Sequence, residues 1–382
     1  MTRVAIVAGV RTPVAKKDKS YRDVHPVDLL ATSFDGAIAA AGLDPADVDM
    51  GLAGATGQAG GQAQNIGRNA WLSAGFSMAV PISTLDAQCP SSQLATHLGA
   101  ASIAAGDASV VITGGVESLT RVPMGVATKV GDDGPFSPTL SAHWDMPHQG
   151  EAAERAAEKY GITREACDEY GVRSHLAAHA AWERGAFDDE VVPVTVDGTV
   201  LLERDEGIRP DSSVDKARSL PSVYRSDGVN NAANSSQLSD GSAAIVLASE
   251  EACARLGLSP LAWIRSTTWA GNDPDIIFDG PNYATAKILD RPGLTLDEMR
   301  LIDVHEAYAV PVLIWQEHFG MSLDRVNLDG GAISIGHPFG ATGARQLLHL
   351  AHALRAAGGG IGLSTMCGGG GIATATVIES AG

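Results

Sequence analysis

Two cysteines lie in segments whose composition suits thiol chemistry. Cys89 stands in STLDAQCPSSQLATHLGAA, just before a stretch with helical spacing, and Cys367 precedes four glycines in LSTMCGGGGIATATVIES. A thiol at a helix N-terminus faces the positive end of the helix dipole, which lowers its pKa and raises its thiolate fraction. Bare glycine backbone lets N–H groups approach a substrate carbonyl. Cys89 is therefore a candidate nucleophile that could carry an acyl group as a thioester.

Two histidines are further candidates. His337 lies between Gly336 and Pro338 in GHPFGATG, so backbone geometry holds its ring, which favours a functional role over an ordinary surface histidine. His305 begins HEAY, and it lacks a second histidine four residues later, so this pair is not a metal site. We expect no metal and no bound cofactor.

The first third of the chain predicts the elements that position Cys89. A strand begins near Val4, a helix follows around residues 28–42, and a glycine-rich loop leads to a short helix near residue 70. After Cys89, we expect a helix that ends at Gly106 and buries Leu94, Leu98 and Ile103. The next segment, ASVVITGG, predicts a buried strand that ends in a glycine turn.

The end of the chain repeats this order of elements. GHPFGATG predicts a glycine turn, and the helix after it should bury Leu347, Leu350 and Leu354. IGLSTM predicts a strand, CGGGG a turn, and IATATVIES a closing strand. The repetition favours two similar α/β lobes. Between them, QGEAAERAAEKYGITREACDEYGVRSHLAAHAAWERG is helical, with Thr163 as a helix cap, and belongs to an insertion that covers substrate or serves as an oligomerisation arm.

Composition excludes several classes of protein. The 382 residues carry a formal net charge of −18, which argues against a nucleic-acid-binding surface. We expect no membrane insertion, because no stretch approaches about 20 uninterrupted apolar residues. The four cysteines are too widely spaced for a disulfide framework or a zinc site, so we expect a cytoplasmic protein.

The motifs occur together and in order along the whole chain. QCPSSQLATHLGAASIAAGDASVVITGGVES, GGAISIGHPFGATGARQL and GLSTMCGGGGIA resemble the signature stretches of the thiolase family. The resemblance implies an α/β thiolase fold: two βαβαβαββ lobes form a five-layered α-β-α-β-α core, with an inserted loop domain. The implied domains are residues 1–118 with 239–260 returning to them, a loop domain at 119–238, and a C-terminal lobe at 261–382.

The resemblance also implies a role for each candidate residue. Cys89 would be the nucleophile, His337 would take its proton and donate to the thioester oxygen, and Cys367 would be the second acid–base. The N–H groups of Cys89 and Gly369 would form an oxyanion hole. His305 stands where much of the family has an asparagine that positions a water. Coenzyme A would be a co-substrate, and its binding residues would include His148, Gln149, Ala233 and Ser236.

Two departures from the family pattern bear on substrate choice. Ser92 stands where glycine is usual, and Gln237 follows Ser236 where glycine is usual. Both are expected to add bulk near the tunnel for the pantetheine arm of coenzyme A. GGVESLTRVPMG is similar to thiolases that degrade bulky acyl chains, and Gln149 replaces the methionine of biosynthetic acetoacetyl-CoA thiolases.

These features favour reversible cleavage of 3-ketoacyl-CoA, leaning to degradation of medium, long or bulky chains. A biosynthetic acetoacetyl-CoA thiolase is one alternative. A catalytically silent protein that binds acyl-CoA or sterol is another, and a decarboxylating ketoacyl synthase is disfavoured by Cys367. The resemblance implies a homodimer or homotetramer.

Overall fold

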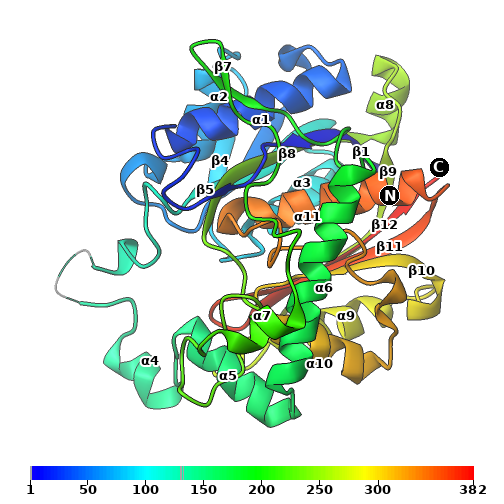
Figure 1. Cartoon of the computed structure of the whole chain (residues 1–382). Coiled ribbons are helices and arrows are strands. Elements are labelled where there is room, and N and C mark those ends of the chain that lie inside the picture. Colours follow the sequence, from blue (N-terminus) through cyan, green and yellow to red (C-terminus); the bar gives the residue numbers. More distant parts are fainter. Residues whose placement is uncertain (1, 130, 132) are drawn as a thin grey trace.

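The computed structural model describes residues 2–129, 131 and 133–382. Within these residues, ten strands form one mixed sheet with the order β10-β11-β12-β9-β1-β8-β5-β3-β4, and β2 pairs with β8 at its side (Figure 1). The strands of this sheet are β1 Val4–Arg11, β2 Ala15–Lys16, β3 Met50–Gly54, β4 Ile82–Leu85, β5 Val110–Ser118, β8 Ser239–Ser249, β9 Ala262–Gly271, β10 Met299–Val304, β11 Gly360–Gly368 and β12 Ile372–Ser380.

Strands β1 and β9 join two similar halves of the sheet. They pair antiparallel over a short register in which Val4 faces Ile264 and Ile6 faces Ala262. In the first half β5, β3 and β4 run parallel, and β8 and β1 follow antiparallel. In the second half β10 and β11 run parallel, and β12 and β9 follow antiparallel. The predicted pair of α/β lobes is therefore present.

Two helices lie between the halves. Helix α3 (Ser91–Ala105) packs on β3, β5 and β8, whereas α11 (Phe339–Ala356) packs on strands of both halves and on α3 itself. Helices α1 (Pro26–Ala41) and α2 (Ile66–Ser73) cover the outer face of the first half. Helices α9 (Gly280–Leu289) and α10 (Ala309–Phe319) lie outside the second half. The result is the expected order of five layers, α-β-α-β-α (Figure 1).

Residues of α3 and α11 match most of the expected core. Leu94 and Ile103 are buried on α3, and α3 ends at Gly106 in the left-handed conformation, as predicted. Leu347, Leu350 and Leu354 are buried on α11, also as predicted. Leu98 is 42% exposed, so its predicted burial was wrong. Helix α3 is buried on several sides rather than along one apolar stripe, since Ser92, Gln93 and Ala95 are buried as well as Leu94.

The glycines of ITGG do not form a turn, which corrects the prediction for this segment. Strand β5 continues through Gly114 and Gly115 to Ser118. A Cβ on Gly115 would lie 2.0 Å from the carbonyl oxygen of Gly340. Bare backbone at this position therefore lets the first turn of α11, which follows His337, approach the end of β5.

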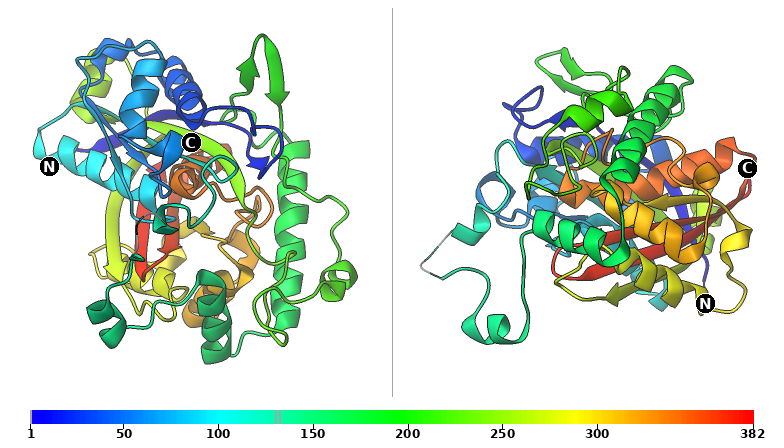
Figure 2. Two further views of the ribbon diagram at one scale, coloured as in Figure 1. Left: turned by 90° about the vertical axis from the view of Figure 1, so that its left-hand side faces the viewer. Right: turned by 60° about the horizontal axis from the view of Figure 1, so that its bottom comes forward.

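The chain between β5 and β8 forms a separate covering layer. It contains α4 (Pro138–His143), α5 (Gln149–Tyr160), α6 (Arg164–Glu183) and α7 (Val214–Ser219), together with a hairpin of β6 (Val194–Val196) and β7 (Thr199–Leu202). Figure 2 shows α4 on an arm that extends from the body. The predicted long helix is two helices, because Gly161 ends α5 and Thr163 caps α6 by accepting a hydrogen bond from the Ala166 N–H.

A buried network of charges ties this layer to both halves. Arg11 of β1 donates to Glu190 at 2.6 Å and to Asp205 at 2.7 Å, and both acids belong to the covering layer. His349 of α11 lies 3.0 Å from Glu190 and 3.0 Å from Asp329. The acids hold the pKa of His349 at about 10 although burial acts to lower it. The network therefore contains a charged imidazole at neutral pH.

One further helix, α8 (Glu250–Leu256), connects β8 to β9. In the part of the chain that the structure describes, no helix is both long and apolar enough to cross a membrane.

Candidate active site

Cys89 lies in a tight turn directly before α3. Gln88 has a φ of 58°, an uncommon conformation for a residue with a side chain. The Ser91 hydroxyl donates to the Gln88 carbonyl at 2.5 Å and accepts the Ala87 N–H at 2.9 Å. Pro90 is the N-cap, one residue before the helix begins. The turn fixes the Cys89 thiol at the base of a cavity.

Two backbone N–H groups face the Cys89 sulfur. They belong to Cys89 itself and to Gly369, which follows β11 in the glycine turn. A Cβ on Gly369 would lie 3.0 Å from Gln149 Nε2 and 3.1 Å from Gln88 Oε1, so the turn fits closely against both side chains. This is the pair of groups expected to form an oxyanion hole, and the arrangement can stabilise negative charge beside the sulfur.

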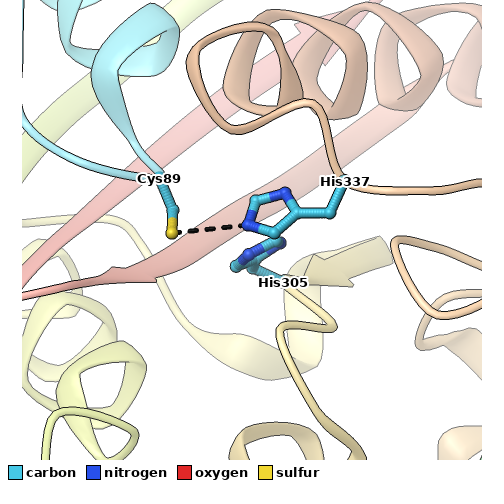
Figure 3. Close-up of side chains that lie close together, drawn as sticks. All are labelled: Cys89, His305 and His337. Atoms are coloured by element: carbon cyan, nitrogen blue, oxygen red, sulfur yellow. Dashed lines mark hydrogen bonds between the residues drawn. The ribbon is translucent and has the colours of Figure 1, made fainter. Parts of the chain in front are cut away.

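His337 contacts the thiol from the loop before α11. Its Nε2 lies 3.4 Å from Cys89 Sγ, and its Nδ1 lies 2.7 Å from the Thr342 hydroxyl oxygen (Figure 3). The Thr342 hydroxyl donates its single hydrogen to the Pro338 carbonyl at 2.9 Å, so Thr342 accepts from Nδ1–H. That bond leaves the lone pair of Nε2 directed at Cys89. The ring is therefore in the tautomer that a base needs.

His305 packs against His337, with ring centroids 4.4 Å apart (Figure 3). It follows β10, and its N–H donates to the Thr365 carbonyl of β11 at 2.9 Å. Neither of its ring nitrogens has a hydrogen-bond partner among the described residues, although the side chain is buried. Burial lowers the pKa of His305 to about 3, and Arg345 contributes in the same direction. A neutral imidazole with free nitrogens can bind a water or a substrate oxygen.

The second cysteine reaches the same site from the other half of the sheet. Cys367 lies near the end of β11. Burial is the main cause that raises the pKa of its thiol well above the ordinary value, and the nearby Cys89 raises it further. The backbone packs closely here, since a Cβ on Gly368 would lie 2.6 Å from Pro90. The structure thus brings Cys89, His305, His337, Cys367 and Gly369 together, from both halves of the fold.

The charge state of Cys89 differs from the one expected from its position. Burial raises the pKa of the thiol to about 12, with Glu117 and Asp86 adding to the rise, and this outweighs the two facing N–H groups. Burial also lowers the pKa of His337 well below its ordinary value. The prediction of a lowered thiol pKa was wrong for the protein without substrate. The resting pair is a neutral thiol beside a neutral imidazole.

Two cavities meet beside this pair. A cavity of about 140 Å³ is lined by Cys89, Glu117, the apolar residues of the segment 119–127, Gln149 and Phe339. A second, of about 110 Å³, is lined by His337, His148, Ser236, Tyr308 and Leu238. Met124, Gln149 and Phe339 line both. A ligand can therefore reach the sulfur from one side while a second group occupies the other.

Of the predicted binding residues, one lies apart. Ala233 lines a third depression with Arg209 and Lys216, outside the two cavities at the sulfur. His148, Gln149 and Ser236 line the second cavity. The side chain of His148 also caps α5, since it accepts the Gly150 N–H at 3.2 Å.

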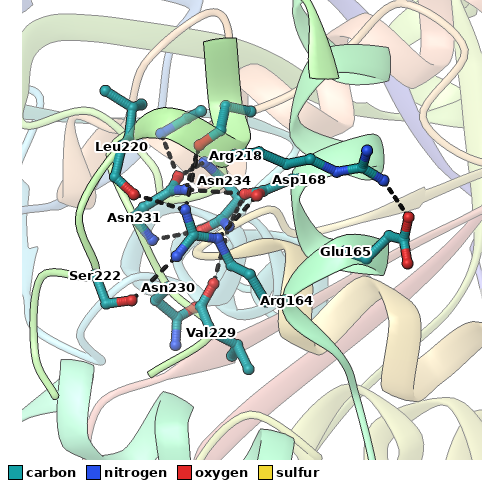
Figure 4. A network of polar contacts seen from close by, with 12 residues as sticks. Arg164, Glu165, Asp168, Arg218, Leu220, Ser222, Val229, Asn230, Asn231 and Asn234 are labelled. Atoms are coloured by element: carbon teal, nitrogen blue, oxygen red, sulfur yellow. Dashed lines mark hydrogen bonds and ion pairs between the residues drawn. The ribbon is translucent and has the colours of Figure 1, made fainter. Parts of the chain in front are cut away.

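A polar network holds the segment that carries Ala233 and Ser236 (Figure 4). Asp168 of α6 accepts from Asn231 at 2.9 Å, from Asn234 at 2.8 Å and from Arg164 at 2.8 Å. Ser236 N–H then donates to the Ala307 carbonyl at 3.0 Å, two residues after His305. The covering layer and the His305 loop are therefore fixed to each other at the mouth of the second cavity.

The two departures from the family pattern do not fill this cavity. Ser92 accepts the Ala344 N–H at 2.8 Å and is fully buried between α3 and α11. The Gln237 amide donates to the carbonyls of Gly207 and Ile333, at 3.0 and 2.9 Å. The structure does not place the expected added bulk beside the sulfur, because neither side chain lines either cavity and both bond to backbone elsewhere.

Thr342 and Glu117 are site residues that the sequence reasoning missed. Glu117 is the one charge in the buried strand β5, and its carboxylate accepts the N–H groups of Thr56, Gly57 and Gly340, each at 3.0 Å. It thereby joins the floor of the first cavity to the first turn of α11. A lone acid inside an apolar strand was the signal available for Glu117. Nothing in the sequence marked Thr342 out from other helical threonines.

Comparison with known proteins places this site in a family. Residues 4–251 match the thiolase N-terminal domain and residues 258–380 match the thiolase C-terminal domain. Steroid 3-ketoacyl-CoA thiolase FadA6 of Mycobacterium tuberculosis is 38% identical, over 99% of this chain and 94% of that protein. An acetyl-CoA acetyltransferase of Chromobacterium violaceum is 37% identical, over 98% of this chain and 99% of its own.

Solved structures agree with the sequence comparison. Human mitochondrial 3-ketoacyl-CoA thiolase has a TM-score of 0.91 and 32% identity, covering 100% of this chain and 99% of its own. Bacillus anthracis acetyl-CoA acetyltransferase has the same TM-score, 0.91, at 36% identity and the same coverage, 100% and 99%. The chain belongs to the thiolase family. It is an acyltransferase with the α/β thiolase fold.

Proposed function

We propose that this chain catalyses the reversible, coenzyme A-dependent cleavage and condensation of 3-ketoacyl-CoA and acetyl-CoA, with Cys89 carrying the acyl group. The observation that carries the proposal is the contact of 3.4 Å between Cys89 Sγ and a His337 nitrogen whose lone pair faces the sulfur. Burial keeps both groups neutral at rest, so the thiol loses its proton only when a substrate accepts the sulfur.

In the cleavage direction, His337 removes the Cys89 proton and the sulfur attacks the 3-keto carbon. The bond between carbons 2 and 3 breaks, and its electron pair passes to the acetyl-CoA enolate. Cys367 protonates that enolate, and the acyl group remains on Cys89 as a thioester. The thiol of a second coenzyme A gives its proton to the Cys367 thiolate and attacks this thioester. The bond between the acyl carbon and the Cys89 sulfur breaks, the shortened acyl-CoA leaves, and the Cys89 sulfur regains its proton from His337.

The remaining site residues stabilise oxyanions in this scheme. The N–H groups of Cys89 and Gly369 receive the oxygen of the acyl thioester, because both face the sulfur. His305 holds a water near the acetyl thioester oxygen with its unpartnered nitrogens. No metal and no bound cofactor takes part; coenzyme A is a substrate, held with its arm in the cavity of His148, Gln149 and Ser236.

The first cavity supports acyl groups larger than acetyl. Its 140 Å³ is about ten times the volume that one water needs, and Leu119, Val122 and Val126 give it apolar walls. We therefore favour degradation of medium, long or bulky 3-ketoacyl chains. A biosynthetic acetoacetyl-CoA thiolase remains the alternative, and a silent protein that binds acyl-CoA or sterol is less consistent with the aligned His337.

Comparison of two substrates tests this proposal. Thiolysis of acetoacetyl-CoA and of a long or bulky 3-ketoacyl-CoA is followed for the wild type, Cys89→Ala and the matched control Cys253→Ala. We expect the wild type to have a higher kcat/KM for the larger substrate. Cys89→Ala should show no turnover, whereas Cys253→Ala should keep the wild-type activity. A higher kcat/KM for acetoacetyl-CoA would support a biosynthetic acetoacetyl-CoA thiolase. Binding of substrate without turnover in the wild type would support a catalytically silent binding protein.

We propose three units for this enzyme. They are residues 1–118 with 239–260, a lid at residues 119–238, and residues 261–382.

We propose a cytoplasmic place of action, since Cys89, Cys167, Cys253 and Cys367 are all free thiols. A homodimer or homotetramer is also proposed, and the exposed Met78, Phe136 and Trp144 support it. Light scattering on the purified chain measures that state.

A further inference from the structure

Three potential metal ligands meet at the active site. The Cys89 sulfur and one nitrogen each of His305 and His337 all lie within 4.8 Å of one another. The three residues come from α3's leading turn, the loop after β10 and the loop before α11 (Figure 3). Sequence spacing gave no hint of this cluster, because 216 residues separate Cys89 from His305.

His305 supplies an independent observation. Its side chain is 1% exposed, and neither ring nitrogen is paired within the described residues. A buried imidazole without partners loses the hydrogen bonds that water would give it, so a ligand that binds it restores that loss. Thr342 already holds the far nitrogen of His337 and leaves the near one free to coordinate, which is the usual arrangement behind a metal-bound histidine.

The donor set fits one ion in particular. One thiolate and two imidazoles suit Zn²⁺. Tetrahedral bonds of about 2.3 Å to sulfur and about 2.0 Å to nitrogen set sulfur and nitrogen about 3.5 Å apart. The observed separation of Cys89 Sγ from His337 Nε2 is 3.4 Å. One nitrogen of His305 lies within 4.8 Å of both atoms.

Charge and access also favour a cation. Glu117 and Asp86 act on the Cys89 thiol as negative charges, whereas Arg345 is the opposing cation that acts on both histidines. Cys89 and His337 each line a cavity, so a hydrated ion can enter, and one coordination position would remain open to that space.

We propose that Cys89, His305 and His337 form a reversible inhibitory site for Zn²⁺. Binding exchanges the thiol proton for the ion: the S–H bond breaks, the sulfur–zinc bond forms, and the proton leaves to solvent. The zinc is an inhibitor and not a cofactor, since it occupies the sulfur that carries the acyl group. The inhibition depends on the proposed function, whereas the binding does not.

Binding is measured on the substrate-free protein after treatment with a chelator. Calorimetry with Zn²⁺, and absorption with Co²⁺ as a spectroscopic substitute, are applied to the wild type, Cys89→Ser and His305→Ala. Cys253→Ser and His97→Gln are matched controls, because each changes a buried cysteine or histidine elsewhere. We expect the wild type to bind one ion per chain and to show a thiolate-to-cobalt absorption band. The affinity should be at least ten-fold weaker in Cys89→Ser and His305→Ala and unchanged in the two controls. A ten-fold loss is roughly what changes behind a metal ligand already cause.

Wild-type protein alkylated at Cys89 is a second preparation that avoids any folding defect of the variants, and it should lose the cobalt band. Unchanged affinity in Cys89→Ser and His305→Ala, or no binding by the wild type, overturns the site. Thiolysis with added Zn²⁺, then with chelator, tests the second half of the proposal. Zinc bound at this site without loss of thiolysis overturns the inhibition, while absent thiolysis without zinc counts against the proposed function only.

Discussion

The Nδ1 nitrogen of His337 lies 2.7 Å from the Thr342 hydroxyl oxygen, and this bond determines which nitrogen faces Cys89. The Thr342 hydroxyl donates its hydrogen to the Pro338 carbonyl, so it can only accept a hydrogen bond from the His337 ring. Thr342 thereby determines which ring nitrogen of His337 carries the hydrogen. Thr342 is a positioning residue in the sense that its effect passes through His337.

Replacement of Thr342 by valine should impair the transfer of the proton from Cys89. The valine cannot accept Nδ1–H, so the ring loses its fixed tautomer, and we expect kcat to fall about 10- to 100-fold with little change in KM. Steady-state thiolysis measures both constants. Thr376→Val is the matched control, since Thr376 bonds the ring of His97 at 2.7 Å away from the site. An equal loss in both variants, or no rescue by Thr342→Ser, contradicts the assignment.

Replacement of Cys367 by alanine should separate the two half-reactions. In the proposed mechanism, acylation of Cys89 by an acyl-CoA needs His337, whereas removal of a proton from acetyl-CoA needs Cys367. We expect condensation to fall by about 10²- to 10⁴-fold while the acyl adduct still forms. Intact-mass spectrometry detects the adduct on Cys89. Its absence from Cys367→Ala, with Cys167→Ala still acylated, would falsify this division of roles.

Loss of the His305 imidazole should slow the carbon–carbon step more than acylation. In the proposed mechanism the ring nitrogens of His305 hold a water that stabilises the enolate charge, so His305→Ala should lower condensation about 10- to 100-fold. His305→Asn places a shorter hydrogen-bonding group at the same position and should retain more activity than alanine. Single-turnover measurements of the two steps make the comparison. Equal activity of the alanine and asparagine variants contradicts a role in holding water.

Selective alkylation of Cys89 should depend on His337. We expect iodoacetamide to label Cys89 faster than Cys167, because His337 accepts its proton despite the raised thiol pKa, about 12. His337→Gln should slow labelling of Cys89 at least ten-fold and leave Cys253 unchanged. Peptide mass spectrometry after timed labelling gives the rates. Labelling that stays selective for Cys89 in His337→Gln shows that another group activates the thiol.

The buried network around His349 should give stability a defined pH window. The pKa of His349 is raised to about 10, so its contribution is complete below its unfolded value, about pH 6.5, and is lost as pH rises through about 10. The pKa of Glu190 is lowered to about 2, so its contribution is complete above about pH 4.5 and is lost as pH falls through about 2. Stability from this pair should be greatest between those limits.

Urea unfolding of the wild type and His349→Gln tests this window. We expect the variant to be about 3–5 kcal/mol less stable near pH 6, because it leaves Glu190 and Asp329 without their buried partner. The difference should shrink as pH rises past about 10. His179→Gln is the control on the neighbouring helix α6. A difference that does not change with pH excludes titration of His349 as its source.

The sequence predicted the elements better than the surroundings of each element. Gly106 and the three leucines of α11 were readable, because a left-handed cap and a helical repeat are local features. Leu98, Gly114 and Gly115 were misread, because their surroundings depend on α3 and α11 lying between two halves of a sheet. No local pattern records which strand faces a given glycine.

The same distinction applies to the site. Cys89, His337, Cys367 and Gly369 were identified because motifs mark them, and the structure brings them together. The shift of the Cys89 pKa was predicted in the wrong direction. Burial by both halves of the fold raises this pKa by more than the facing N–H groups lower it. The positions of Ser92 and Gln237 were also misjudged, since their hydrogen-bond partners are distant in sequence.

The junction between β1 and β9 has a consequence for how the enzyme could be divided. In the sequence Cys89 precedes β9, whereas His337 and Cys367 follow it. Of two polypeptides made by cutting between α8 and β9, the first would lack His305, His337 and Cys367, and the second would lack Cys89. Turnover from such a mixture would report their reassembly, so the chain is suited to a fragment-complementation sensor whose signal is its own thiolysis.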